Sequence, residues 1–423
     1  MRQLAELAEL FADSVIGDPV GVALTGITLA TADLRSGEVF VAIAGANRHG
    51  AEFAAAAAEA GAVAVITDAA GAAIAAGAGI PVLIVDNPRA LLGTLSAWVY
   101  GTGTGSDTLS GRALAAASKD LPPMPLLFGT TGTNGKTSVS HLLEGILQQV
   151  GAVTGLSSTA ERHIGDQIVV SRLTTPEASE MHALLALMRE RGVEAVAVEV
   201  SAQALSRHRV DGIVFDVAGF TNLSHDHLDD YADMREYFEA KAPLFQPDRA
   251  RRGVVSLDTA AGHEIVAGAG IPIVTVGTPA IAQDATAAAA ADWVVTIGDE
   301  VQAYTEFTLS GPDGRSLTTR VPVIGPHMAA NASLAIVMML EVGYEWDAIV
   351  NALTRDGGIR AYLPGRTERV SGDTGPAVFV DFGHSPDAFE KTLAAVRRVT
   401  PGKVLMLFGA DGDRDASKRL DMG

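Results

Sequence analysis

The segment LLFGTTGTNGKTSVSHLLEGIL, residues 126–147, is the most informative part of this sequence about the fold. An apolar run leads into a glycine-rich turn, and Lys136 and Thr137 open a run of residues with helical periodicity. A strand, a loop and a helix in this order form a phosphate cradle, in which loop amides and the lysine hold phosphate oxygens and the hydroxyl binds Mg²⁺. The strict loop pattern has glycine where this chain has Thr130. Because a strand precedes and a helix follows, we predict phosphate binding rather than a chance turn. The expected binding residues are Gly132, Thr133, Asn134, Gly135, Lys136, Thr137 and Ser138, with Gly129 helping the backbone to wrap round the phosphate.

Composition limits the classes of protein to which the chain can belong. Its 423 residues are too many for one core and enough for two or three domains, and 48% hydrophobic with 19% charged residues indicates a globular protein. The net charge of −19 argues against nucleic acid and acidic membrane surfaces as partners. The chain has no cysteine, which excludes disulfides and thiolate chemistry and fits a reducing cytoplasm. We therefore expect a cytoplasmic protein, and we also expect a monomer, although composition does not determine the oligomeric state.

No membrane insertion is expected from the sequence. Residues 1–15 form an amphipathic helical pattern with acidic residues and lack the basic start and the apolar core of a signal peptide. The Ala/Gly-rich runs are too weakly apolar to span a bilayer.

Three blocks follow one another along the chain. Residues 1–105 alternate short β-rich runs at 39–43, 62–66 and 81–85 with Ala-rich helical pieces, which predicts a small α/β domain. The segment 101–125 is rich in Gly, Ser and Pro and is interpreted as a linker.

The second and third blocks are also α/β in pattern. Residues 106–350 repeat an apolar run, a turn and a helix, which predicts a parallel sheet with helices on its faces. The expected strands are 126–128, 195–200, 214–221, 253–256 and 273–276. Residues 351–423 read as strand, helix and strand, with the second strand after Gly402. This block is short for a domain, so we expect it to be truncated.

Charged residues follow the apolar runs of the second block. Glu199 ends an apolar strand, and a carboxylate beside a phosphate loop is where a Mg²⁺ contact is needed. His227 lies in an Asn-x-x-x-Asp-His-x-Asp pattern, although a single histidine among acids is more often a surface residue. Lys241 lies in a helical pattern whose apolar neighbours predict half-burial. A buried ammonium is costly, so Lys241 is either salt-bridged or chemically altered.

The sequences of these motifs resemble those of one protein family, and the resemblance extends over nearly the whole chain. The loop sequence TGTNGKTS is similar to that of the Mur ligase superfamily, which includes folylpolyglutamate synthases. The other motifs resemble the E-type Mur ligases, the branch of UDP-N-acetylmuramoyl-tripeptide synthetases, and folylpolyglutamate synthases lack TTPE followed by the Asp-His segment. These motifs are TTPE at 174–177, EVS at 199–201, TNLSHDHLD at 221–229 and EAK at 239–241.

The resemblance implies a fold and a reaction. The implied fold is α/β with three domains: a small N-terminal α/β domain, a central P-loop domain with a parallel sheet, and an incomplete Rossmann-like C-terminal domain. The implied enzyme is a ligase that uses ATP and Mg²⁺ to add a free amino acid, through an acyl phosphate, to UDP-N-acetylmuramoyl-L-Ala-D-Glu in peptidoglycan synthesis. The added amino acid stays open among lysine, diaminopimelate and ornithine.

The resemblance also implies roles for individual residues. Catalytic roles fall to Lys136, Lys241 and His227, and Mg²⁺ ligands would be Thr137, Glu199, His227 and Lys241 as a carbamate. ATP would also be contacted by Asn331, Arg366 and Asp381. Residues expected to bind the UDP-muramoyl-dipeptide are Thr31, Asn47, Thr174, Thr175, Ser201, Arg207 and Arg209.

The chain departs from the family pattern at several of these places. The usual DSR motif of the uridine site reads Ala-Thr-Ala at 30–32, and Arg207 replaces a common glutamine. Met328 replaces the first asparagine of the adenine segment. A non-catalytic nucleotide-binding homologue, or an inactive fragment, therefore stays open as the alternative.

A last motif, DNPR at 86–89, is identical to the signature by which diaminopimelate-adding members recognise their amino acid. In the family that signature lies in the third domain, whereas here it follows an apolar run of the first. We interpret it as a strand-to-helix connection, with Asp86 capping the helix and Pro88 starting it.

Overall fold

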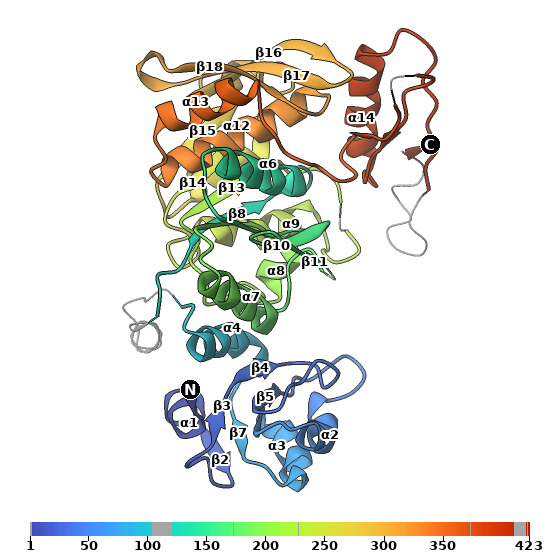
Figure 1. Ribbon diagram of the computed structural model, residues 1–423. Helices are drawn as coiled ribbons and strands as arrows, with labels where there is room; N and C mark the ends of the chain where they lie inside the picture. The colour runs from blue at the N-terminus through green and yellow to red at the C-terminus, as the bar shows by residue number, and fades with distance from the viewer. Residues whose placement is uncertain are drawn as a thin grey trace. The chain divides into compact units, whose positions relative to one another are not determined.

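The computed structural model describes residues 2–103, 121–171, 173–226, 228–372, 374–409, 420 and 422–423. The chain forms two compact units. Figure 1 colours the chain by residue number, from blue at the N-terminus to red at the C-terminus. Unit 1 consists of Met1–Met124, Pro176–Arg191 and Gln203–Val214, and unit 2 of Pro125–Thr175, Gly192–Ala202 and Phe215–Gly423.

Unit 1 contains a five-stranded sheet with the order β2-β7-β6-β5-β4, in which β4 to β7 are parallel and β2 is antiparallel to β7. Its strands are β1 (Arg2–Gln3), β2 (Ser14–Ile16), β3 (Ala23–Leu24), β4 (Gly26–Thr28), β5 (Glu38–Val41), β6 (Ala64–Thr67) and β7 (Val82–Ile84), with β1 and β3 forming a separate pair. Its helices are α1 (Leu4–Phe11), η1 (Gly50–Phe53), α2 (Ala54–Glu59), α3 (Ala69–Ala75), η2 (Ala76–Ala78), α4 (Pro88–Tyr100) and α7 (Ala178–Glu190). The three predicted strands and the N-terminal helix are confirmed.

Two hydrophobic clusters, one on each side of this sheet, hold unit 1 together. One joins α1 and α4 to the sheet through residues such as Leu7, Leu95 and Trp98, and it includes Ala178 at the start of α7. The other joins Phe40 to alanines of α2 and α3. Each fully buried leucine contributes about 2 kcal/mol relative to an exposed one, so these clusters keep the strand ends of unit 1 in place.

Helix α4 begins where the DNPR motif lies, but its cap differs from our expectation. Asn87, not Asp86, is the N-cap, and its side-chain oxygen accepts a 3.0 Å hydrogen bond from the Ala90 amide. Pro88 occupies the first turn as predicted, and Gly101 ends the helix in the left-handed conformation. Asn and Asp cap equally well, so the identity of the capping residue is set by where the strand ends.

Unit 2 is built on a sheet with the order β11-β10-β9-β12-β8-β13-β14-β15-β16-β17-β18. The strands from β9 to β16 in this order are parallel, and antiparallel strands extend both edges. The strands are β8 (Leu126–Thr131), β9 (Thr154–Ser157), β10 (Glu161–Ile164), β11 (Gln167–Val170), β12 (Ala195–Glu199), β13 (Val217–Phe220), β14 (Gly253–Ser256), β15 (Ile273–Gly277), β16 (Trp293–Val301), β17 (Tyr304–Ser310) and β18 (Ser316–Val321). The predicted parallel strands are confirmed, whereas the antiparallel edges were not anticipated.

Helices α6 (Lys136–Gln149) and α12 (Pro326–Glu341) lie side by side on this sheet (Figure 1), α6 against β8, β9 and β12, and α12 against β13 to β18. Their buried residues, Leu142 and Met338 among them, form the main core with Phe128 of β8. The other helices of unit 2 are α9 (Met234–Lys241), η3 (Ala242–Phe245), α10 (Ala260–Gly268), α11 (Ala285–Ala289), η4 (Pro312–Gly314), α13 (Trp346–Asp356) and α14 (Pro386–Arg398), and the short α8 (Ala202–Ser206) begins in unit 2 and continues into unit 1. The carboxyl ends of β8, β12 and β13 therefore meet at one edge, which is where open α/β sheets bind ligands.

The third block is only partly as predicted. Its strands β19 (Glu368–Arg369) and β20 (Phe379–Val380) form a two-stranded pair, and Ser385 caps α14. The strand predicted after Gly402 is absent from the described residues, and Leu405 and Leu407 are 92% and 101% exposed. A strand needs a partner for its backbone hydrogen bonds, and the described part of the chain supplies none beside residues 403–409.

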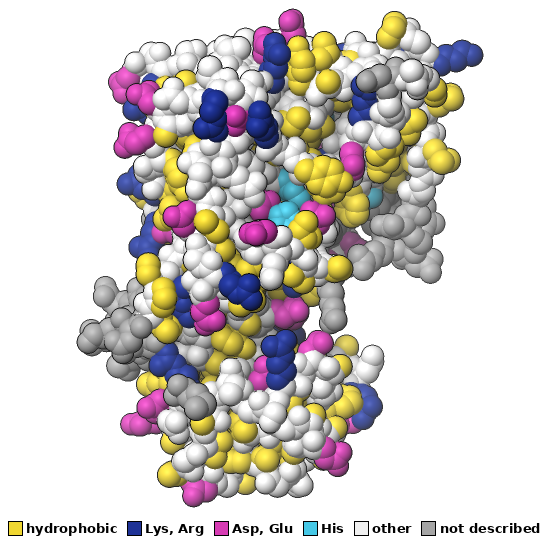
Figure 2. Space-filling view, in the orientation of Figure 1, with side chains coloured by type: hydrophobic (Ala, Val, Ile, Leu, Met, Phe, Trp, Pro, Cys, Tyr) yellow, Lys and Arg dark blue, Asp and Glu magenta, His cyan; other side chains and the backbone are white. Residues whose placement is uncertain are grey.

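The described surface carries charges of both signs. Basic and acidic side chains are interspersed over the face shown in Figure 2. Among the described helices, none has both the length and the hydrophobicity that a bilayer span requires.

Candidate active site

The glycine-rich loop lies between β8 and α6, as predicted. Gly132 and Gly135 have φ values of +146° and +92°, in the region that favours glycine. Thr130 pairs with neighbours on both sides, Glu199 of β12 and Gly219 of β13, so this position is regular strand and needs no glycine. Gly129 also lies in β8, packed against the ring of Phe215, so the prediction that it helps the loop to wrap is wrong.

The segment that follows β13 holds the loop in shape. The Thr221 hydroxyl donates to the Asn134 carbonyl at 2.6 Å, and the Asn222 carbonyl accepts from the Thr133 amide at 2.9 Å. The Asn222 side chain accepts from the Asn134 amide at 3.0 Å. A Cβ atom at position 132 would collide with the Thr221 hydroxyl. The loop is therefore fixed by its neighbours before any ligand binds.

Gly132→Ala should deform this loop. We expect it to lower the free energy of unfolding by about 2 kcal/mol more than Gly151→Ala does, because the new methyl group collides with Thr221. Gly151 is the matched control, since its φ is +95° and a Cβ atom added there would meet no atom within 4 Å. Urea unfolding measures the stabilities, and titration with ADP should show weakened binding only for Gly132→Ala. Equal effects of both changes would contradict this account.

Lys136 is the first residue of α6 and points back onto its own loop. Its Nζ donates to the carbonyls of Gly132 at 3.0 Å and Thr133 at 2.8 Å. Burial lowers the pKa of Lys136, and the Arg366 guanidinium adds to this, while the carboxylates of Glu199 and Asp226 oppose it. Asp226, which is 5% exposed, is thus part of the site, although the sequence drew attention to the histidine beside it.

Glu199 is fully buried at the end of β12 and is held by hydrogen bonds from Thr159. The amide and the hydroxyl of Thr159 lie 3.0 Å and 2.9 Å from its two carboxylate oxygens. The Thr174 hydroxyl lies 2.9 Å from that of Thr159, and the Thr175 hydroxyl donates to the Glu199 carbonyl at 2.7 Å. The Ser201 amide donates to Thr175. Four predicted residues therefore form one network, with Thr159 as the member that the sequence missed.

Lys241, at the end of α9, is 1% exposed, so it is more deeply buried than the half-burial we predicted. Its Nζ donates to the Gly132 carbonyl at 3.2 Å and lies 4.1 Å from the centre of the Tyr237 ring. Burial lowers its pKa well below the usual lysine value, Lys136 lowers it further, and Asp226 opposes the shift. Among the described residues, no carboxylate lies within ion-pair distance of Lys241. A salt-bridged structural lysine is therefore not what the structure shows.

A cavity of about 170 Å³ lies beside the loop in unit 2. Asn331 lines it, and its side-chain oxygen faces Gly135. Burial raises the pKa of Asp258 to about 6, even though the Thr278 amide donates to its carboxylate at 2.6 Å. Burial lowers the pKa of His327 to about 4, so this histidine is neutral at pH 7. The cavity is thus a polar pocket next to the phosphate loop, with a neutral histidine in its wall.

Arg366 and Asp381 lie on the segment that precedes α14. Nη2 of Arg366 donates to the Thr137 hydroxyl at 2.7 Å, which places its charge at the loop. Asp381 is exposed and accepts hydrogen bonds from the amides of Thr367 and Gly383, both at 2.7 Å. The structure thus brings Arg366 to the loop and gives Asp381 a role in shaping its own turn. His227 lies outside the described residues.

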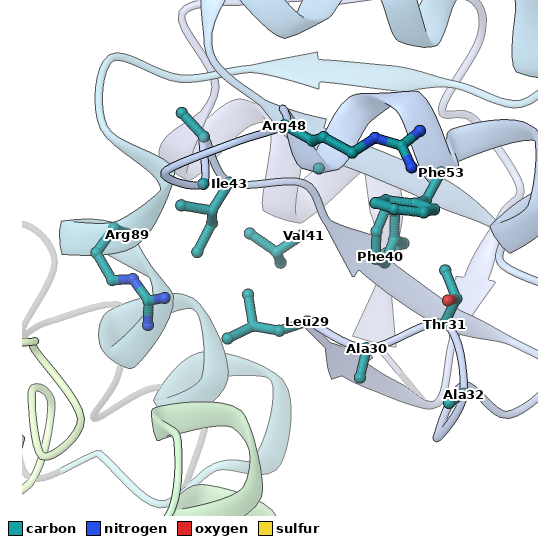
Figure 3. A pocket seen from close by; sticks show the side chains of 13 residues that line it. Leu29, Ala30, Thr31, Ala32, Phe40, Val41, Ile43, Arg48, Phe53 and Arg89 are labelled. Carbon is teal, nitrogen blue, oxygen red and sulfur yellow. The ribbon is translucent and has the colours of Figure 1, made fainter. Parts of the chain in front are cut away.

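A second cavity, of about 400 Å³, lies in unit 1 (Figure 3). Its floor is apolar, with Leu29, Val41 and Ile43, and Phe40 and Phe53 lie at one end. Thr31, which we expect to bind the UDP-muramoyl-dipeptide, is one of the lining residues. The remaining lining residues are Ala30, Ala32, Ala44, Gly45, Arg48, Gly50 and Arg89. Asn47 is exposed and is not among the residues that line this cavity.

Two arginines of unit 1 predicted to bind the substrate, Arg207 and Arg209, have different surroundings in the structure. Arg209 binds Glu177 at 3.0 Å, and Glu177 also binds Arg89 at 2.6 Å. Arg207 is exposed. Arg89 belongs to the DNPR motif, which we interpreted as a connection alone, and that interpretation is incomplete because its side chain lines the cavity.

Comparison with known proteins identifies the family. The models of the "Mur ligase family, catalytic domain", the "Mur ligase middle domain" and the "Mur ligase, glutamate ligase domain" match residues 23–100, 130–339 and 365–423. The chain therefore belongs to the Mur ligase family, and it is an ATP-dependent ligase of peptidoglycan synthesis. The resemblance read from the motifs is confirmed.

Individual relatives are similar over almost the whole chain. A UDP-N-acetylmuramyl-tripeptide synthetase of Leifsonia xyli is 57% identical over 422 residues, which cover 100% of this chain and 77% of the relative. A UDP-N-acetylmuramoyl-L-alanyl-D-glutamate–2,6-diaminopimelate ligase of Streptomyces avermitilis is 42% identical, covering 95% of this chain and 73% of the relative.

The fold is shared with solved structures. That of a UDP-N-acetylmuramoyl-L-alanyl-D-glutamate–2,6-diaminopimelate ligase aligns with a TM-score of 0.73 at 24% identity, covering 100% of this chain and 79% of the other. The MurF ligase of Thermotoga maritima in complex with ADP aligns with a TM-score of 0.61 at 18% identity, covering 90% and 77%. The predicted α/β architecture of the Mur ligases is therefore confirmed.

Proposed function

We propose that this chain adds the third amino acid to UDP-N-acetylmuramoyl-L-Ala-D-Glu. The observation that carries the proposal is the convergence of Lys136, Glu199 and Lys241 on one loop in unit 2. The names of the relatives support the step, because a tripeptide synthetase and a diaminopimelate ligase of the same dipeptide both add a third residue.

The chain's own residues account for the phosphoryl transfer. Amides of the loop and Nζ of Lys136 hold the γ-phosphate of ATP, and Arg366 adds a second cation. A glutamate carboxylate of the dipeptide attacks that phosphate, so an acyl phosphate and ADP form. The amino group of the incoming amino acid then attacks the acyl carbon, an amide bond forms, and phosphate and a proton leave.

The pocket beside the loop is suited to the adenine of ATP. Asn331 can donate and accept hydrogen bonds there, and His327 is neutral. Asp381 lies on the same segment of the third block as Arg366, and we assign it to the ribose end of the nucleotide. The unit 1 cavity takes the uracil base, since two phenylalanine rings and an apolar floor suit a flat heterocycle.

The residues present fit Mg²⁺. This cation prefers oxygen ligands and binds few carboxylates together with substrate phosphates. Thr137 offers a hydroxyl and Glu199 a buried carboxylate. Among the described residues, no group of three or more His, Cys, Asp or Glu side chains could hold a metal ion by itself. When bound, Mg²⁺ neutralises charge on the phosphates. We assign Thr137, Glu199, carbamoylated Lys241 and His227 as its ligands.

Carbamoylation of Lys241 explains how a lysine can serve such a site. Burial and the charge of Lys136 lower the pKa of its amine well below the usual lysine value, which favours the neutral, nucleophilic form. A neutral amine attacks carbon dioxide, an N–C bond forms, and one proton leaves, so that a carbamate anion replaces a cation. The resulting oxygens can bind Mg²⁺ and offset the positive charges of Lys136 and Arg366.

Phosphate release tests the proposed function. With ATP and Mg²⁺, we expect release only when UDP-N-acetylmuramoyl-L-Ala-D-Glu and a suitable amino acid are both present, with lysine, diaminopimelate and ornithine tested in turn. Mass spectrometry should show the UDP-muramoyl-tripeptide. Release that ignores either substrate would reject ligation, and nucleotide binding without any release would favour the non-catalytic homologue.

A further inference from the structure

Arg89 is a cation at the unit 1 cavity that the motifs did not assign to any ligand. It lies in the first turn of α4, and Figure 3 places its side chain at the opposite end of the cavity from Phe53. Two charged side chains line this cavity, Arg48 and Arg89. Position 32, where the family pattern has an arginine, is Ala32 and supplies no charge.

The two arginines differ in how far their charge is balanced. Arg48 binds Glu52 through two nitrogens, Nε at 2.9 Å and Nη2 at 2.7 Å, which neutralises the pair. Arg89 binds Glu177 through Nη1 at 2.6 Å. Glu177 is shared with Arg209, so one negative charge is divided between two guanidinium groups. Arg89 therefore shares the Glu177 carboxylate with Arg209, and an anion can bind its remaining donors.

The surroundings of Arg89 favour an anion in other ways. Its side chain is 36% exposed and that of Glu177 is 24% exposed, so solvent screening is only partial. A guanidinium has five N–H donors, and Glu177 occupies one nitrogen. The start of α4 adds the positive end of a helix dipole next to it. Glu177 fixes the orientation of the arginine through one nitrogen and leaves the other nitrogens for a ligand.

We propose that Arg89, held in place by Glu177, binds the diphosphate of the sugar nucleotide and makes this cavity prefer a nucleoside diphosphate to a nucleoside. The proposal rests on the proposed function, which places the uracil at the phenylalanine end. The base fills the apolar end of the cavity, and the diphosphate meets the guanidinium at the other. Arg89 is in this way a specificity-determining residue for the donor of the muramoyl dipeptide.

Calorimetric titration with uridine and UDP tests the proposal, using the unchanged protein, Arg89→Met and Arg89→Lys. Arg35→Met is the matched control, because Arg35 is exposed, lies in the same unit and does not line the cavity. We expect Arg89→Met to reduce the preference for UDP over uridine by about tenfold or more, with uridine affinity unchanged, because a charge-assisted contact is lost. Arg89→Lys should keep part of the preference, and Arg35→Met all of it.

The possible results separate the two proposals. Equal losses for uridine and UDP in Arg89→Met would show a structural role and overturn the inference, as would an undiminished preference for UDP. If the unchanged protein bound UDP no better than uridine, the diphosphate subsite would be wrong while the uracil site stood. If it bound neither ligand, the assignment of this cavity to the sugar nucleotide would fall as well.

Discussion

Lys136→Ala is expected to lower the rate of ligation by about a thousandfold, since one donor to the transferring phosphoryl group is lost. In the structure Nζ of Lys136 lies on the carbonyls of Gly132 and Thr133, within the loop that would surround the phosphates. The side chain needs only to exchange these acceptors for phosphate oxygens. Substrate-dependent phosphate release measures the effect.

A control separates turnover from binding. Lys403→Met removes an exposed lysine far along the chain and should leave the rate unchanged. ADP titration of Lys136→Ala should show weaker nucleotide binding than in the unchanged protein, but a smaller change than the change in rate. If Lys136→Ala ligated at the rate of the unchanged protein, a role for Lys136 in the mechanism would be contradicted.

Lys241→Met is expected to lower the rate by about a hundredfold while stabilising the fold. Methionine has a similar length and no charge, so the buried site no longer has to accommodate an amine. The loss of rate follows from the loss of the carbamate. Carbon-13 NMR with labelled bicarbonate should show a carbamate signal in the unchanged protein and none in Lys241→Met. An equal rate in both proteins would refute the role of this lysine.

The pH dependence of stability provides a second measurement on Lys241. Its pKa is lowered in the folded state, so between the folded and the unfolded pKa the unfolded chain binds a proton that the folded chain does not. Stability should therefore rise with pH from the folded pKa up to the unfolded value near 10.5. In buffer free of carbon dioxide, urea unfolding at pH 7 and pH 10 should show a smaller rise for Lys241→Met. The same rise in both proteins would contradict burial of a neutral amine.

Much of unit 2 could be predicted because its signals are local. Apolar runs in the sequence mark five of its strands, namely β8, β12, β13, β14 and β15. The loop between β8 and α6 has a recognisable glycine-rich sequence. Strands β17 and β18, which we did not predict, have buried and exposed residues in alternation, the two-residue period of a half-buried strand.

The residues that were missed act through partners distant in sequence. Thr159 meets Glu199 across 40 residues because β9 and β12 are neighbours in the sheet. Arg89 meets Glu177 across 88 residues. Neither pair can be recognised from a helical or strand repeat in the sequence, because only the tertiary packing brings the two residues together. The same holds for Lys241, whose complete burial depends on the Tyr237 ring and on the loop beside it.

The carbonyl of Gly132 accepts from both Lys136 and Lys241, at 3.0 Å and 3.2 Å. The two side-chain nitrogens thereby hold the loop in one shape, and the Lys241 nitrogen keeps one N–H donor as a carbamate. Nucleotide binding then becomes an exchange of hydrogen-bond partners within this loop, which is already held in place. The rate of association should accordingly be governed by diffusion and orientation, and its activation entropy should be small. A stopped-flow measurement at several temperatures would read this property of the loop directly.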